Sequence, residues 1–171
     1  MIETFETIYN FLIKFLPFSF GFAFIGFIVL FLLKIFENDK VKKIGIILLV
    51  QFFFLGIIII VMQTTILRKI RNEILEILSD PQTQIITSRN DFKILPQELK
   101  KELLKMQNIP TNHTHPEDQK SVEIISSKGI FKIFIARDSK NKNQFWIFTD
   151  KYEFSKESEI GKVNSAIINN R

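Results

Sequence analysis

Residues 44–67 read IGIILLVQFFFLGIIIIVMQTTIL and contain no charged side chain. A helix rises about 1.5 Å per residue, so this stretch is longer than the roughly 20 apolar residues that span the hydrocarbon core of a bilayer. The core helix of a soluble protein would show a polar face, whereas the strongly polar residues here are two glutamines and two threonines. The stretch therefore predicts a transmembrane helix.

A second apolar stretch lies earlier in the chain, at residues 15–34. It begins FLPFSFGFAFIGFIVLFLL, carries no charge over this length and again reaches the length of a span. We expect Pro17 in the first turn of its helix, where no intrahelical N–H bond is lost. A cleaved signal peptide is disfavoured because the leading segment carries two glutamates in place of a basic cluster, and no small-residue cleavage site follows. Residues 1–67 are thus predicted to form a membrane hairpin, with spans at residues 15–34 and 44–67.

Residues 1–14, which lead into the first span, have two interpretations. Their apolar residues recur near helical spacing, which predicts a short interfacial helix with Tyr9 as an amphipathic anchor. The alternative is a frayed lead-in to the first span. The spacing alone does not choose between them.

The connection at residues 34–43 determines how the hairpin would sit in a membrane. So few residues allow only an antiparallel pair of helices, which brings both chain ends to one side. Lys and Arg are equally frequent on the two sides, but the basic cluster formed by Arg68, Lys69 and Arg71 favours the cytoplasm for both termini. The high Lys, Asn and Ile content is typical of AT-rich bacterial genomes, so we expect a multi-pass protein of a bacterial inner membrane.

Three residues within the spans are candidates for helix–helix contact. Gly26 and Gly56 can let helix backbones approach closely, although glycine is also generally frequent in membrane helices. Gln51 carries an amide that seeks a partner inside hydrocarbon, either on the other helix or on a second copy of the chain. We therefore expect these residues at contacts within the hairpin, in a homo-oligomer or with another membrane protein. The plainer alternative is a lone, tolerated glutamine.

Beyond residue 67 the apolar residues continue at helical spacing. The apolar stripe comprises Ile66, Ile70, Ile74, Ile77 and Leu78. Charged residues fill the opposite face, so we expect one helix over residues 41–79 whose last part is an amphipathic stalk at residues 68–80. Asp80 and Pro81 end it. Such a stalk suits self-association or signal transfer, and the alternative is packing of its stripe on the domain that follows.

Residues 81–171 are predicted to form a small soluble α+β domain with a meander-like antiparallel sheet. Strand composition occurs at residues 84–88, 92–95, 121–127, 130–137 and 145–149. Pro96 opens a short helix with apolar residues on one face, and residues 110–120 are polar and predicted to be a loop. Both faces of the strand at residues 130–137 are largely apolar, so both need cover. The helix would cover one face, and the stalk, the tail at residues 160–168, the membrane surface or another subunit would cover the other.

Metal binding and catalysis have few candidates in this sequence. His113 and His115 are the only histidines, and with Glu117 or Asp118 they are weak candidates for a metal site, because a protein metal usually needs three or four converging ligands. Cysteine is absent, which excludes disulfides and thiol catalysis. Known catalytic and nucleotide-binding motifs are also absent from the sequence. We therefore expect no enzyme activity, no metal and no cofactor.

The sequence ARDSKNKNQFWIF, at residues 136–148, suggests an interaction surface. Arg137 with Trp146 and Phe148 can recognise a peptide, a lipid or a phosphate, although aromatic residues in strands more often belong to a core. Asp138 and Ser139 are ordinary turn residues. A hydrolase would require His113 or Asp138 to take part in the chemistry.

These observations lead to two functional hypotheses. The first is a two-span integral membrane protein whose C-terminal domain is a non-catalytic protein-binding, sensor or scaffold module. The alternative is a membrane-perturbing or pore-forming effector that the soluble domain gates. The lipid bilayer is the expected partner. Nucleic acid is not, because the net charge of +5 comes from lysines spread along the whole chain.

Overall fold

The computed structural model describes residues 2–32, 39–87, 92, 94–110 and 113–168. The chain forms two compact units, Met1–Ile66 and Leu67–Arg171, called here the hairpin and the sheet domain. Two long apolar helices are followed by a small domain with a five-stranded antiparallel sheet and helices. This confirms the predicted fold class.

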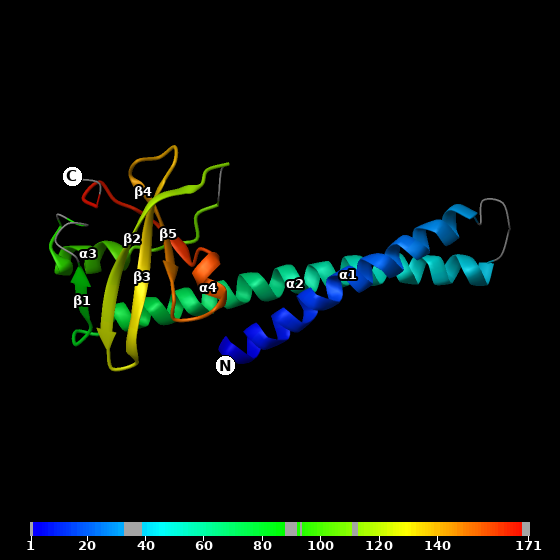
Figure 1. Ribbon diagram of the computed structural model, residues 1–171, viewed down its shortest axis with the longest axis horizontal. Coiled ribbons are helices and arrows are strands. Elements are labelled where there is room, and N and C mark those ends of the chain that lie inside the picture. The colour runs from blue at the N-terminus through cyan, green and yellow to red at the C-terminus, as the bar shows by residue number, and fades with distance from the viewer. Residues whose placement is uncertain (1, 33–38, 88–91, 93, 111–112, 169–171) are drawn as a thin grey trace. The chain divides into compact units, whose positions relative to one another are not determined.

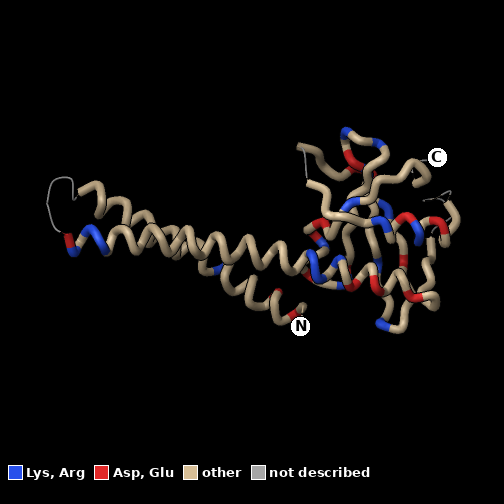
Figure 2. The backbone as a smooth tube through the Cα atoms, turned by 180° about the vertical axis from the view of Figure 1, so that it is seen from behind, with Lys and Arg blue, Asp and Glu red and all other residues tan. Residues whose placement is uncertain are grey.

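Two helices, α1 (Ile2–Leu32) and α2 (Asp39–Ser79), are long and apolar enough to cross a membrane. Figure 2 shows long stretches of both without a charged residue. α1 begins at Ile2, so most of the leading segment is helical and continuous with the first span. Pro17 therefore lies inside α1, and the prediction of a first-turn position is wrong. The helical spacing before it extends the helix, and membrane helices tolerate an interior proline.

The packing of α1 reverses the usual distribution of large and small residues. Its buried residues are Ser19, Ala23 and Gly26, all of them small. Most of its phenylalanines point outward, with Phe18 68% and Phe31 66% exposed. Small residues allow two helix backbones to come close together, and large apolar side chains suit contact with lipid.

The sheet domain contains residues 67–79 of α2 and seven further elements. In chain order these are β1 (Gln84–Thr87), α3 (Pro96–Leu103), β2 (Pro116–Ser126), β3 (Gly129–Asp138), β4 (Gln144–Thr149), α4 (Phe154–Glu157) and β5 (Gly161–Asn164). The strands pair with their chain neighbours in the order β1-β2-β3-β4-β5, all antiparallel. The sheet is therefore a meander, as the sequence predicts (Figure 1).

The two faces of the sheet bury different sets of residues. On one face lie α3 and residues 67–79 of α2 (Figure 1), and its core includes Ile124, Ile133 and Ile147, all fully buried. The polar side of α2 also bonds to the domain, since the Tyr152 hydroxyl donates a 2.6 Å hydrogen bond to Glu73. The predicted stalk is thus an integral part of the sheet domain. The opposite face has its own small core, in which Ala136, Trp146 and Phe148 pack with the partly buried Phe134.

Three local predictions differ from the structure. Among residues 92–95, those that are described form no strand, and the buried Phe92 and Ile94 serve as core residues instead. β2 begins at Pro116, inside the predicted loop, because backbone pairing with β3 holds even its polar end in the sheet. The tail does not lie across a face. It supplies the edge strand β5, where Gly161 allows an approach so close that a Cβ there would lie 2.6 Å from Met106.

Candidate functional site

A polar contact joins the two helices of the hairpin. The Ser19 hydroxyl donates a 3.1 Å hydrogen bond to the Gln51 side-chain carbonyl, and the Gln51 amide donates back to the Ser19 backbone carbonyl at 3.0 Å. The same amide also donates to the carbonyl of Leu48 at 3.2 Å. Both polar atoms of the Gln51 side chain are thus engaged within one chain. Sequence reasoning singled out Gln51 but missed Ser19, whose small size and helical spacing to Ala23 and Gly26 were the available signal.

Glycine brings the same two helices together about two turns further along. A Cβ at Gly26 would lie 2.7 Å from the Gly45 carbonyl oxygen and 2.8 Å from the Leu48 Cβ, so any larger residue would force the helices apart. Gly45 is packed as closely from the other side, against Leu30 and the Gly26 carbonyl. A Cβ at Gly56, by contrast, would meet nothing within 4 Å among the described residues. Gly26 therefore lies at a helix–helix contact inside the hairpin, and Gly56 faces open space.

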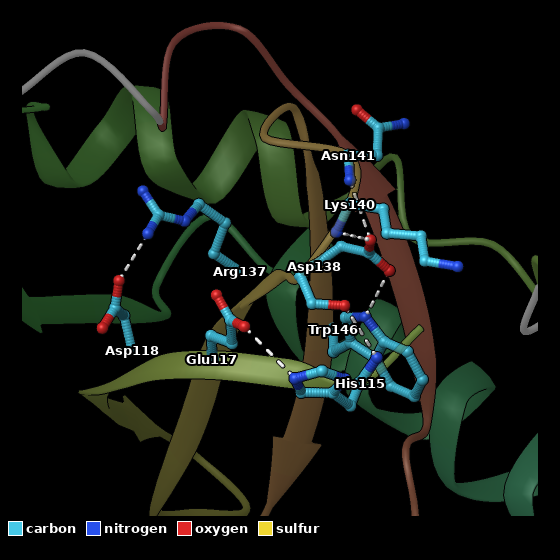
Figure 3. Close-up of polar contacts among 9 residues, drawn as sticks. His115, Glu117, Asp118, Arg137, Asp138, Lys140, Asn141 and Trp146 are labelled. Atoms are coloured by element: carbon cyan, nitrogen blue, oxygen red, sulfur yellow. Dashed lines mark hydrogen bonds and ion pairs between the residues drawn. The ribbon is translucent and has the colours of Figure 1, made fainter. Parts of the chain in front are cut away.

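In the sheet domain, Asp138 is the centre of a buried polar cluster (Figure 3). It ends β3, and its carboxylate accepts the backbone N–H groups of Lys140 and Asn141, both at 2.9 Å, which shapes the turn that follows. The indole N–H of Trp146 donates to the other oxygen at 2.9 Å. Burial would raise the pKa of Asp138, but the hydrogen bonds from Thr114 and these three donors outweigh it and hold the pKa well below its usual range. Asp138 therefore remains a carboxylate and acts as an acceptor.

A buried lysine completes this cluster on the other side of Trp146. Lys162 lies opposite Trp146 in the β4–β5 register and is 1% exposed. Its ammonium group lies 3.8 Å from the centroid of the Trp146 ring and 3.7 Å from a carboxylate oxygen of Glu159. An aromatic face and a carboxylate together compensate part of the loss of hydration of a buried cation. Sequence reasoning missed Lys162 because only the register reveals that it meets Trp146.

The two histidines do not form a ligand set in the described part of the chain. His115 pairs with Glu117 at 3.2 Å, and its backbone exchanges hydrogen bonds with Ser139 across the start of β2. His113 is exposed and has a positive φ of 51°. Within the described ranges, no three His, Cys, Asp or Glu side chains are grouped closely enough to hold a metal ion.

The predicted interaction surface is divided between the two faces of the sheet. Arg137 pairs with Asp118 at 2.6 Å and lies beside Phe145. Trp146 and Phe148 point to the opposite face, where they are 7% and 8% exposed. Successive side chains of a strand alternate between faces, so neighbours in the sequence are separated in space. The structure thus does not bring these three residues to one surface.

Comparison of this chain with family models, with curated proteins and with solved structures finds no match.

Proposed function

We propose that this chain is a two-span integral membrane protein whose sheet domain is a non-catalytic protein-binding, sensor or scaffold module. The observation that carries the membrane assignment is the distribution of residues in the hairpin, where small and polar residues are inside and phenylalanines are outside. Apolar surface of this extent is unfavourable in water and is satisfied by lipid.

The polar groups of the hairpin support the same proposal. In hydrocarbon an unsatisfied amide or hydroxyl costs several kcal/mol. Ser19 and Gln51 are each other's partners, and Thr64 and Thr65 donate their hydroxyls to the carbonyls of Ile60 and Val61 in the preceding turn. The hairpin is therefore adapted to a solvent that offers no hydrogen bonds.

The polar cluster of the sheet domain favours a binding module over an enzyme. A general acid or base near neutral pH needs a pKa close to the working pH. The pKa of Asp138 is instead lowered, further away from neutral pH, and four donors already occupy its oxygens. Lys162 is enclosed beside Trp146. These groups stabilise the fold, which leaves the outer surface of the domain for recognition.

A sensor role is supported by α2, because this one helix supplies residues to both units. A binding event that shifts residues 67–79 would act on a helix that also belongs to the hairpin. We further propose a bacterial inner membrane, cytoplasmic termini, and a homo-oligomer or another membrane protein as partner.

Protease protection combined with crosslinking tests this function. In inverted inner-membrane vesicles we expect trypsin to remove the sheet domain and leave a protected hairpin, and in spheroplasts we expect the domain to survive. The chain should stay in the pellet after carbonate extraction. Crosslinking in intact cells should capture a defined protein partner or a second copy. Extraction by carbonate would contradict the membrane assignment, and the absence of any crosslink would contradict the binding role.

Two controls address the other functions. Dye-loaded liposomes should stay intact with the purified chain, because the Gln51 amide is already used inside the hairpin. Leakage that Gln51→Leu abolishes would support the pore-forming alternative. An activity that is lost in His113→Ala or Asp138→Ala, with the fold retained, would support a hydrolase.

A further inference from the structure

The outer edge of β1 and the groove beside it form a surface that is not part of the polar clusters described above. The groove measures about 550 Å³. It is bounded by the end of α2, by β1 and by α3, and its lining includes Leu78, Ile85 and Leu104 together with Pro81 and Pro96. This volume is in the range of clefts that bind ligands. Serine, threonine and glutamine side chains and two lysines make up the rest of the lining, so the walls of the groove are partly apolar and partly polar.

We propose that this groove binds an extended, acidic segment of a partner protein, which adds to β1 as a further strand of the sheet. The proposal rests on the protein-binding function proposed above and names its site. In such strand addition, main-chain hydrogen bonds give affinity, and alternate side chains enter the neighbouring groove.

The backbone of β1 is suited to receive a strand. β1 is the terminal strand of the sheet, and β2 is its one strand neighbour among the described residues. The carbonyl of Lys132 accepts a backbone hydrogen bond from the β4 side, so Glu123, its partner in β2, bonds toward β1. Ile86 lies opposite Glu123 and bonds inward. By alternation, Ile85 and Thr87 turn their N–H and C=O groups to the outer edge.

The charge of the groove selects an acidic occupant. Lys100 and Lys101 line it, and no aspartate or glutamate among the described residues does so. The ammonium group of Lys100 donates to the backbone carbonyls of Asp80 and Thr83, at 2.7 and 2.9 Å, and it forms no ion pair with a carboxylate in the described part of the chain. Lys101 is exposed and has no ion pair within the described ranges. A carboxylate on the added strand would neutralise this positive rim.

Charge also argues against a second copy of the chain as the occupant. Pairing of two β1 edges about a two-fold axis would bring two lysine-bearing grooves together, and like charges at an interface disfavour it. In a partner segment that has carboxylates between apolar residues, the apolar side chains would contact the apolar lining of the groove and the carboxylates would pair with the lysines.

The test is a selection of linear peptides with the full chain in nanodiscs. A phage-displayed library of random linear peptides is selected on the loaded nanodiscs after removal of clones that bind empty nanodiscs. We expect enriched peptides in which apolar residues alternate with Asp or Glu. Synthesised with blocked ends, they should slow amide hydrogen exchange at residues 84–87.

Two variants and their controls localise binding to the groove. Thr87→Pro removes an outward N–H without breaking the pairing to β2, and Lys101→Glu reverses the charge of the rim. Each should weaken the affinity about tenfold or more, as expected for one lost hydrogen bond or charge contact. Thr87→Val keeps the N–H, and Lys142→Glu makes the same charge change on the loop after β3, so both should bind like the parent. Unchanged Trp146 fluorescence verifies the fold of each variant.

Several outcomes would overturn the proposal. Enriched peptides that protect another segment, or that bind Thr87→Pro and Lys101→Glu like the parent, would exclude the groove while leaving the protein-binding function intact. A selection that enriches nothing would also exclude it. If amide hydrogen exchange at residues 84–87 slowed with increasing protein concentration in the absence of peptide, the occupant of the groove would be a second copy of the chain. The membrane assignment and the binding role themselves are tested separately, by carbonate extraction and crosslinking.

Discussion

The hairpin and the sheet domain differ in the exposure of their phenylalanine side chains. Phe27 in α1 is 58% exposed, whereas Phe148 in β4 is 8% exposed and packs in the core of its sheet face. In α1 the buried positions belong to Ser19, Ala23 and Gly26. The difference fits the membrane location proposed for the hairpin, because water drives aromatic rings inward and lipid does not. In lipid, close backbone packing would replace the hydrophobic effect as the force that joins the two helices.

The largest expected effect comes from the same substitution in both units. Phe148→Ala should lower the free energy of unfolding of the sheet domain by about 3–5 kcal/mol, because it removes buried contacts and leaves a cavity. Phe27→Ala is the matched control and should change the free energy of unfolding of the hairpin by less than about 0.5 kcal/mol. Urea titration in micelles, followed by the emission of the single Trp146, measures the effect in the sheet domain. Titration with a denaturing detergent, followed by circular dichroism, measures the effect in the hairpin. Equal effects would remove the contrast between the two units.

The next effect concerns the polar cluster of the sheet domain. Asp138→Asn should destabilise it by about 2 kcal/mol at pH 7, because charged hydrogen bonds are lost. The pKa of Asp138 is lower in the folded than in the unfolded chain, so its stabilisation is present above about pH 4 and declines as the pH falls toward the folded pKa. Urea midpoints between pH 7 and pH 2 should therefore fall more in the parent than in Asp138→Asn. Parallel pH profiles would show that Asp138 contributes nothing through its charge.

A smaller effect is expected from glycine packing in the hairpin. Gly26→Ala places a Cβ 2.7 Å from the Gly45 carbonyl oxygen and should weaken the pairing of the two helices by about 1–3 kcal/mol. Gly56→Ala adds a Cβ in open space and should leave the pairing unchanged. The chain has no cysteine, so spin labels on one introduced cysteine in each helix report the interhelical distance cleanly. A distance that is unchanged in Gly26→Ala would show that the helices do not depend on this contact.

The smallest effect tests the polar pair of the hairpin. A double-mutant cycle with Ser19→Ala and Gln51→Leu should give a coupling energy of about 0.6 kcal/mol, the average for hydrogen bonds between membrane helices. Titration with a denaturing detergent, followed by circular dichroism, supplies the four free energies. A coupling of zero would mean that the two side chains do not stabilise the hairpin as partners.

How much of this structure the sequence predicts depends on the length of each pattern. A long apolar run such as residues 44–67 can be recognised as a helix from its length and hydropathy alone. The helical spacing from Ile70 to Leu78 likewise identifies side chains that are buried in the structure. Short or polar segments have no such pattern. β2 starts among polar residues at Pro116, and β5 has only four residues, so both depend on pairing with a neighbouring strand.

The residues of the candidate sites could also be predicted only where the signal lies in a contiguous stretch of sequence. Gln51 could be singled out as a lone amide in an apolar run, but its partner Ser19 lies 32 residues away. Asp138 could be recognised only as a turn residue, because its contacts with Trp146 and Thr114 come from other strands and loops. Arg137 and Trp146 are close in the sequence, but strand alternation and the burial of Trp146 place them on different faces of the sheet.

The sequence by itself determined that this chain has two apolar helices and a small antiparallel α+β domain, because length, hydropathy and periodicity are properties of contiguous residues. Only the tertiary structure decided which residues inside each unit meet: Ser19 with Gln51, Gly26 with Gly45, and Trp146 with Asp138 and Lys162. It also revealed that the terminal strand β1 lies beside a partly apolar groove lined by two lysines. Such contacts join residues that are distant along the chain, so no local pattern encodes them.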